Sequence, residues 1–432
     1  MVPVKEGGRE MQPRHRFPRW SLVGAAVLAV ATVAWMLVGI PTMVKYPTDL
    51  DVSPQYEGTF TLFVDPASAA PLEEPLVVPL TVDRRIRALG DQSGSSTVVV
   101  EETIIQRAGD LLDATQTNVY VMDRSTLENV ADDRAYSFDP DNVVDRSPAF
   151  RLNLPFDTDP DGSYEIFQNE IEDTYRMQPD AVTPRSDTEG LTLSNFTAAV
   201  SEAPMGDAYF AELNKTVPLP SELTFEQLRP HLLAAGIDVD AVLAALAPVI
   251  SSEDLGTLAE ATTQPIALTY VISFEGRAGV ETVTGAEVDV SAAEAIGARP
   301  DLASADALRD VLAGYPDVPE AVDAIESLDA LLTGPPVALF EYEYEQTDES
   351  VAAIADEIRP MRQQILLAKL WLPVGLVALA LLVLAAGALV WVRRRSGDDA
   401  PDATPPPSSP TIDLRPTPTE AAPDPHAVAT TR

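Results

Sequence analysis

The chain has 432 residues, of which 46% are apolar, so it is long enough to bury at least one large hydrophobic core. Its formal net charge of −38 predicts a surface that repels nucleic acids and anionic lipid headgroups, so we expect no nucleic-acid partner. The chain contains no cysteine, which excludes disulfides and zinc sites built on thiolates.

The N-terminal end predicts a membrane anchor. Residues 1–19 are basic, and residues 20–44 then contain no charged side chain. About 20 apolar residues are enough to cross a bilayer. Residues 29–31 resemble a signal-peptide cleavage site, but the apolar sequence continues to Ile40, beyond the usual length of a signal's hydrophobic region. We therefore predict that residues 20–44 form an uncleaved transmembrane helix.

A second uncharged run, residues 370–392, predicts another transmembrane helix. Trp371 and Trp391 would lie about 30 Å apart along it, which places an aromatic ring at each face of the hydrocarbon layer. Arginines at 393–395 follow at once, as basic residues precede the first run. The positive-inside rule then places both termini in the cytoplasm and residues 45–369 outside the plasma membrane. Residues 393–432, rich in Pro, Thr and Asp, are predicted to be a disordered cytoplasmic tail.

The first half of the region between the two runs alternates as β-strands do, with many β-branched and aromatic residues separated by Pro, Asp and Gly. Similar alternation returns near residue 265 and again near residue 337. The predicted strands are residues 56–64, 96–107, 115–124, 149–156, 163–171, 190–200, 265–276 and 337–347.

Helical patterns fill two segments of the same region, about 221–262 and 302–332. Thr224 and Gln227 predict a capping box at the start of the first, and Gly236 predicts a helix end. Pro230 predicts a kink or two short helices. The fold class is therefore an α+β membrane protein whose β-rich extracytoplasmic domain carries helical insertions between two terminal transmembrane helices. The first insertion is either a small bundle that closes one end of the β-rich body or a mobile cap over an apolar cavity.

One acidic loop is a candidate metal site. Asp157, Asp159 and Asp161 stand two residues apart and Gly162 follows, as at the start of an EF-hand calcium loop. However, the twelfth position is Gln168 where that loop needs a glutamate, and the flanking sequence reads as strands. Asp and Gly are also the residues that tight turns prefer. We interpret the segment as a hairpin turn, with a weak calcium site as the alternative and no other cofactor.

Residues for catalysis are scarce. Of the three histidines only His231 lies in the central region, within a helical pattern, so a Ser-His-Asp triad is not expected. A glycan hydrolase would need two carboxylates facing one cleft, and the sequence singles out no such pair. Acidic pairs such as Glu101–Glu102 are interpreted as solvated. We predict that the protein is not an enzyme, with glycan hydrolysis as the alternative.

Two segments resemble a known family. The run "DRSTLEN" at residues 123–129 and the run "LPFDTD" at residues 154–159 are similar to motifs of the actinobacterial PorA-type porin family, often described only as a domain of unknown function. The resemblance extends from the first apolar run through the second and implies an actinobacterial cell-envelope protein. The general layout is also similar to scavenger-receptor class B proteins, which pass lipids through an interior tunnel.

These observations favour a membrane-anchored envelope protein that binds or conveys a lipid or other apolar envelope component through its extracytoplasmic domain. Its expected partners are the bilayer, an envelope lipid and other envelope proteins. The alternatives are a structural or assembly subunit, or a channel-associated protein of the porin family. A transmembrane β-barrel crosses the membrane with strands, whereas this sequence offers two apolar helices for that task.

Overall fold

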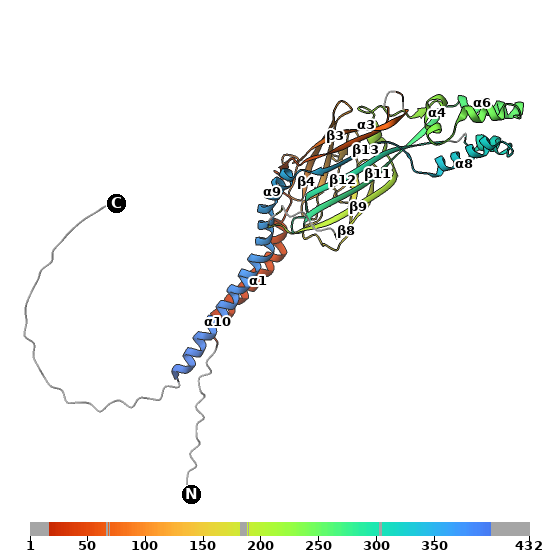
Figure 1. The fold of residues 1–432 in the computed structure, drawn as a ribbon. Coiled ribbons are helices and arrows are strands. Elements are labelled where there is room, and N and C mark those ends of the chain that lie inside the picture. The colour runs from red at the N-terminus through yellow and green to blue at the C-terminus, as the bar shows by residue number, and fades with distance from the viewer. Residues whose placement is uncertain are drawn as a thin grey trace, which may run out of the picture. The chain divides into compact units, whose positions relative to one another are not determined.

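The computed structural model describes residues 17–65, 68, 70–181, 188, 190–301 and 305–398 (Figure 1). The basic residues predicted to flank the first apolar run lie mostly outside the described residues, as does the predicted tail from residue 399 onward. The chain divides into two compact units. One comprises Met1–Val30 with Leu376–Arg432, and the other comprises Ala31–Gly375.

The first unit holds most of two long apolar helices, α1 (Arg19–Ala34) and α10 (Leu372–Asp398). They approach closely at small residues, because a Cβ on Gly387 would lie 2.5 Å from the Cβ of Ser21 and one on Gly24 would lie 3.2 Å from Val383 Cγ1. The helical stretches Arg19–Met43 and Asp348–Arg395 are each long and apolar enough to cross a membrane. The predicted spans 20–44 and 370–392 coincide with their apolar parts.

In the second unit, the same two stretches each contain a π-helical turn, η1 (Trp35–Gly39) and η2 (Leu367–Trp371). η1 leads into α2 (Ile40–Met43), and α9 (Asp348–Leu366) leads into η2. The Trp35 indole nitrogen donates a hydrogen bond of 2.8 Å to the carbonyl oxygen of Ala368. A π-turn shifts the register of the helical hydrogen bonds. The two segments therefore contact each other at their π-turns.

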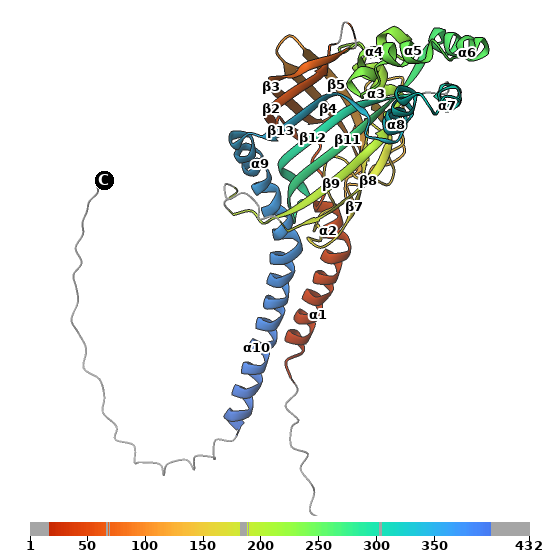
Figure 2. The same cartoon turned by 45° about the vertical axis from the view of Figure 1, so that its right-hand side comes forward.

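The body of the second unit is one antiparallel sheet (Figure 2). Its strands follow the order β6-β5-β4-β3-β2-β13-β12-β11-β9-β8-β7, while β1 pairs with β3 and β10 pairs with β11. The strands are β1 (Asp51–Val52), β2 (Gln55–Val64), β3 (Pro71–Ala88), β4 (Thr97–Ala108), β5 (Leu112–Asp123), β6 (Tyr136–Ser137), β7 (Tyr164–Gln168), β8 (Asp173–Asp180), β9 (Leu193–Pro204), β10 (Glu222–Leu223), β11 (Ile266–Glu281), β12 (Ala286–Pro300) and β13 (Val337–Gln346).

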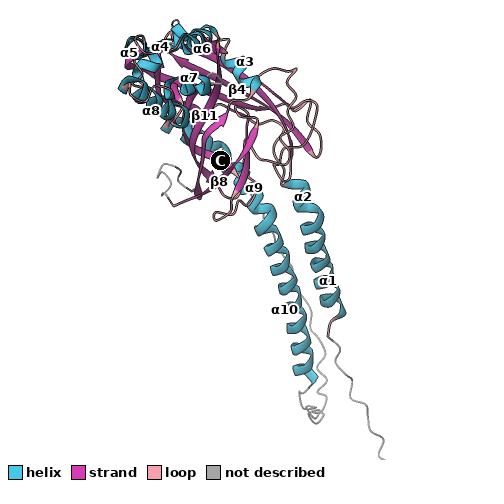
Figure 3. Cartoon of the chain, turned by 90° about the vertical axis from the view of Figure 1, so that its right-hand side faces the viewer, coloured by secondary structure: helices cyan, strands magenta, loops and turns pink. Residues whose placement is uncertain are grey.

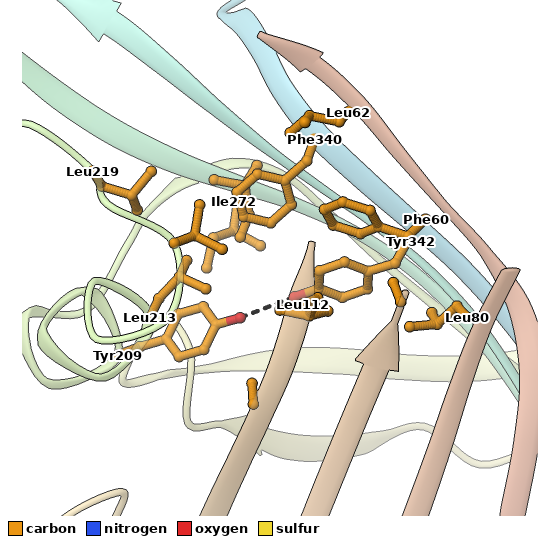
Figure 4. Packing of buried hydrophobic residues seen from close by; sticks show 14 of the residues in the cluster. Phe60, Leu62, Leu80, Leu112, Tyr209, Leu213, Leu219, Ile272, Phe340 and Tyr342 are labelled. Atoms are coloured by element: carbon orange, nitrogen blue, oxygen red, sulfur yellow. Dashed lines mark hydrogen bonds between the residues drawn. The ribbon is translucent and has the colours of Figure 1, made fainter. Parts of the chain in front are cut away.

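The sheet is strongly curved, and its concave face encloses the main core (Figure 4). Alternate residues of the central strands point inward, as the period of two in a strand requires. Phe60 on β2, Phe340 on β13 and Ile272 on β11 are each at most 1% exposed and meet in this core. The short helix α3 (Asp207–Leu213) adds Tyr209 to the same cluster.

The remaining helices gather near one end of the sheet (Figure 3). The two predicted helical segments pack together, because Leu228 and Leu246 of the first share a buried cluster with Leu312 and Leu328 of the second. The helices are α4 (Phe225–Ala234), α5 (Val239–Leu246), α6 (Ser252–Thr263), α7 (Ala305–Ala313) and α8 (Pro319–Thr333). We call this group the helical block.

Some local predictions are confirmed and others are wrong. The capping box of Thr224 and Gln227 is formed, and Gly236 has φ +90° just after α4. Pro230 does not divide the helix, which runs unbroken from Phe225 to Ala234. The strand predicted at 149–156 is an irregular loop with only isolated bridges, and the sequence did not predict β3, β8 or β12.

Candidate functional site

The two ends of the sheet are joined by the side chain of Arg146. Its guanidinium donates hydrogen bonds to the carbonyl oxygens of Val119 (3.1 Å) and Tyr136 (2.9 Å) and to Asn169 Oδ1 (2.9 Å). It also lies 4.5 Å from the centre of the Tyr120 ring. Asn169 follows β7, whereas Tyr120 lies on β5, so these contacts link the β5–β6 end of the strand order to the β7 end. The sheet thereby encloses an interior.

A buried ion pair lies inside this enclosure. Glu102 on β4 is fully buried and accepts hydrogen bonds from Arg84 Nε (2.7 Å), Tyr120 OH (2.6 Å) and Asn118 Nδ2 (3.3 Å). Burial alone would raise the pKa of Glu102, but the charges of Arg84 and Arg151 and the hydrogen bonds outweigh it and hold this pKa at about 2. Glu102 is therefore ionised at neutral pH.

Three further carboxyl groups line the same interior, but their neighbours stabilise the charged form less than those of Glu102 do. Glu294 Oε1 accepts a hydrogen bond from Tyr342 OH (2.8 Å), and Tyr342 OH is bonded to Tyr209 OH (2.9 Å; Figure 4). Burial, reinforced by the charge of Glu170, raises the pKa of Glu294 to about 8. Burial also raises the pKa of Glu170 and of Glu287. The interior thus combines one firmly ionised carboxylate with three that hold their protons to higher pH.

These groups line one cavity of about 100 Å³, whose walls come from strands across the whole sheet. Three of its lining polar atoms, Gln168 Oε1, Glu170 Oε2 and Arg151 Nε, are buried without a hydrogen-bond partner among the described residues. Buried polar atoms in proteins almost always have a partner in the protein, in ordered water or in a ligand. We call this space the polar cavity and take it as the candidate functional site.

A smaller cavity of about 60 Å³ adjoins the polar cavity, and the two share Tyr56, Arg84, Glu287 and Val290 in their walls. Its other boundary is α9, which contributes residues from Ile354 to Met361. The interior of the sheet therefore extends to the packing surface of the helix that leads into the second apolar segment.

Two other cavities are lined almost wholly by apolar side chains. One, of about 60 Å³, lies between the sheet and α4 and includes Leu62, Leu268 and Phe340. The other, of about 100 Å³, lies among the helices of the helical block and includes Leu246. Leu228 on α4 contributes to the walls of both. We call them the apolar cavities, and they are separate spaces, not one continuous tunnel.

The three aspartates of the predicted calcium loop lie in an irregular loop before β7, not at the tip of a two-stranded hairpin. Asp157 Oδ2 accepts a hydrogen bond of 2.5 Å from Lys369 Nζ, and Asp159 Oδ1 accepts one of 3.0 Å from the Asp161 backbone N–H. Among the described residues, no three His, Cys, Asp or Glu side chains are grouped as a metal site would require. The aspartates thus act here as turn and ion-pair residues, and calcium binding remains a prediction.

The other residues considered from the sequence also have clear positions. His231 is 8% exposed on α4 and lines the apolar cavity next to the sheet. Glu102, interpreted as solvated, is 0% exposed, and that interpretation is wrong. The cause is that inward-facing positions of this sheet carry charge, so alternation alone cannot tell the interior face from the solvent face. The residues of the polar cavity that sequence reasoning missed are Arg84, Glu102, Arg151, Gln168, Glu170, Glu287 and Glu294.

The fold defines a class of protein in which a curved antiparallel sheet with helical insertions lies, in the order of the sequence, between two apolar helical stretches. The chain belongs to the porin PorA family, because the model of that family matches residues 19–389. This confirms the resemblance predicted from the sequence. No curated protein matches the chain.

Among solved structures, a protein described as a MaoC domain dehydratase from Chloroflexus aurantiacus is 13% identical, with 74% of this chain and 80% of that chain covered. The TM-score of 0.11 is too low for that likeness to bear on the fold or function of this chain.

Proposed function

We propose that this envelope protein of the PorA family binds or conveys a lipid or other apolar envelope component through the domain formed by residues 45–369, without catalysing a reaction. In this proposal the two apolar helices anchor the domain in the plasma membrane, both termini are cytoplasmic and the domain is extracytoplasmic. The partners are the bilayer, the bound envelope component and neighbouring envelope proteins.

The observation that carries the proposal is the pair of apolar cavities. A packed protein interior has few spaces larger than a water, and an empty apolar space of this kind stays dry and accepts apolar ligands. Here two such spaces, of about 60 and 100 Å³, lie on either side of Leu228, with little polar surface in their walls. A hydrocarbon chain is the ligand that such walls favour, because burying apolar surface contributes about 25 cal/mol per Å².

Lipid analysis of the full chain, purified from its native envelope in a mild detergent, tests the proposal. We expect mass spectrometry to detect a co-purifying molecule with a hydrocarbon chain. Leu228→Trp and Ala298→Leu, which fill the apolar cavities, should reduce its amount at least about fivefold, because overpacked sites exclude ligand. Leu255→Trp, at a 52% exposed position on α6 outside both walls, is the control and should retain the molecule. The proposal fails if the unmodified protein carries no such molecule, or if filling the cavities leaves its amount unchanged.

A channel is a second candidate because it follows from the family. The strands in the middle of the sheet, however, carry carboxylates on their outward face. Glu57 and Glu345 lie directly opposite each other, and Glu275, Glu341 and Glu343 are exposed beside them. A strand wall facing lipid carries an apolar band, so this face argues against a pore built from these strands. Conductance steps across a planar bilayer with purified protein, absent in a detergent blank, would favour the channel.

An assembly role is favoured by one feature of the helical block. Leu233, Leu243, Val249 and Leu255 are each at least 42% exposed. A contact with another molecule would cover these apolar side chains. Crosslinking in intact cells, followed by purification under denaturing conditions, should capture a partner through this block if assembly is the role. A protein that migrates alone after crosslinking excludes it.

A further inference from the structure

The polar cavity is distinct from the two apolar cavities, and the main core of the sheet lies between them. Gln168 and Glu170 are 3% and 7% exposed, and each presents an acceptor oxygen to the cavity without a partner among the described residues. Arg151 presents an unpartnered donor to the same space. An unpartnered buried polar atom costs about 1–3 kcal/mol, so all three favour a guest that both donates and accepts hydrogen bonds.

The charges in the walls restrict the guest further. The ionised carboxylate of Glu102 repels a phosphate or a carboxylate. A bare cation would face the guanidinium of Arg151. Arg84 offers little to an anion, because Glu102 already holds its Nε at 2.7 Å. A group without net charge meets neither objection.

Hydroxyl groups fit what remains, since each hydroxyl donates one hydrogen bond and accepts up to two. The acceptors are the oxygens of Gln168 and Glu170, and the donor is Arg151 Nε. Tyr175 and Tyr344 line the cavity as well and add an apolar ring with a polar tip. We propose that the polar cavity is a binding site for an uncharged, hydroxyl-rich group, such as a sugar or polyol, either free or as the headgroup of a glycolipid.

The size of the polar cavity is compatible with this class. A single water needs roughly 10–15 Å³ of cavity space, so a volume of about 100 Å³ holds a group several times larger. The adjoining cavity of about 60 Å³ shares Arg84 and Glu287 with the polar cavity and is bounded by Ile358 and Met361 of α9. α9, which is not a strand of the sheet, therefore closes that end of the interior.

The full chain in a zwitterionic detergent tests the site, because sugar-based detergents would compete. We expect glycerol, myo-inositol or glucose to give saturation-transfer NMR signals, with binding observed in the millimolar range or tighter. In a second arm, the chain in phosphatidylcholine nanodiscs is compared with and without a glucosyl diacylglycerol. Binding of the free probes assigns a free sugar or polyol as the source. Binding only in the nanodiscs that contain the glycolipid assigns a lipid headgroup.

Variants distinguish the site from nonspecific binding. Ala292→Leu fills the polar cavity from β12, and its neighbour Ala293→Leu, which is exposed on the opposite face of the same strand, is the matched control. Gln168→Leu removes one unpartnered acceptor at nearly constant volume, so it should fold even if Ala292→Leu does not. We expect both cavity variants to weaken binding at least tenfold and the control to leave it unchanged.

The proposal is overturned if neither the free probes nor the glycolipid binds, since the cavity then holds only water. Equal binding by Gln168→Leu, Ala293→Leu and the unmodified chain also overturns it. The proposed function can fail separately, because it requires a hydrocarbon chain near Leu228, whereas this test detects hydroxyl groups near Gln168.

Discussion

At the scale of single residues, neighbouring carboxylates in the polar cavity differ in protonation because their partners differ. Glu102 has Arg84 at 2.7 Å, and this contact offsets the cost of burying its charge. Glu294 has a tyrosine hydroxyl at 2.8 Å and the acidic Glu170 nearby, so burial prevails and raises its pKa to about 8. A buried charge is tolerated only where a partner of opposite charge is close.

This difference predicts how stability depends on pH. In the unfolded chain Glu294 has its usual pKa of 4.5, whereas in the fold its pKa is about 8. Between these values the folded chain keeps a proton that the unfolded chain has released, so the free energy of unfolding decreases as pH rises from 4.5 to 8. Glu294→Gln cannot ionise, and we expect it to remove a decrease on the order of a few kcal/mol over that window.

Urea unfolding at pH 5.0, 6.5 and 8.5 measures this effect. The unmodified protein should lose stability at each step, and Glu294→Gln should lose less. Glu345→Gln, at an exposed position on β13, is the control and should follow the unmodified protein. Glu102 does not reverse the trend. Its pKa is about 2 in the fold and 4.5 in the unfolded chain, so its contribution to stability is lost only as pH falls below 4.5. Equal slopes for all three proteins would contradict the assigned state of Glu294.

At the scale of elements, α1 and α10 depend on small residues for their close approach. Membrane helices pack closely where Gly, Ala or Ser lets the backbones meet. Here a Cβ added to Gly387 would lie 2.5 Å from the Cβ of Ser21, too close for any side chain. We expect Gly387→Leu to weaken the association of synthetic α1 and α10 segments about tenfold in fluorescence energy transfer between labelled segments in micelles.

Gly375→Leu is the matched control, because a Cβ at that position of α10 meets nothing within 4 Å. It should leave the energy transfer unchanged. If Gly387→Leu and Gly375→Leu behave alike, the approach at Ser21 does not hold the two helices together.

The elements also show which patterns the sequence could reveal. β2, β4, β5 and β13 were predicted because their exposed and buried residues alternate with β-branched and aromatic side chains. β3 was missed because Pro71, Pro75 and Pro79 suggest a loop. The structure explains their tolerance: β4 pairs with β3 only from Thr81 onward, so the proline-bearing half has a neighbour on one side alone.

Two other errors have physical causes as well. β12 is rich in alanine, which has little strand propensity and carries no strong alternation. The sequence predicts a strand at 149–156 because apolar residues such as Leu152 and Leu154 alternate with polar ones, and the structure leaves these two side chains only 2% and 1% exposed. An extended loop that packs on the core produces the same pattern as a strand. The helix start was predicted more reliably. The capping hydrogen bonds between Thr224 and Gln227 join residues that are close in the sequence, so they do not depend on the tertiary fold.

At the scale of the whole molecule, the family and the apolar helices could be predicted from the sequence, but the polar cavity could not. Its charged residues come from strands that are distant along the chain and that the curved sheet, joined at its ends by Arg146 and Asn169, brings together. Between Tyr46 and Ala368 the sequence holds 59 acidic residues, and only the curvature of the sheet separates the interior ones from the solvated ones.

The basic residues that flank the two apolar runs predict the orientation of the molecule. Residues 1–19 are basic and Arg393–Arg395 follow the second apolar run directly, whereas the inner ends of the two runs carry only Lys45 and Lys369. Positive charge is retained on the cytoplasmic side during membrane insertion. We therefore expect Asp110, in the exposed turn between β4 and β5, to be outside the cell and Ser408 to be inside.

Labelling of single cysteines measures this orientation cleanly, because the native chain has none and the unmodified protein is its own blank. A membrane-impermeant maleimide should label Asp110→Cys in intact cells, and it should label Ser408→Cys only after permeabilisation. Labelling of Ser408→Cys in intact cells, with Asp110→Cys protected, would place the domain in the cytoplasm. An extracytoplasmic envelope ligand could then reach neither the apolar cavities nor the polar cavity, and both binding proposals would need a cytoplasmic ligand.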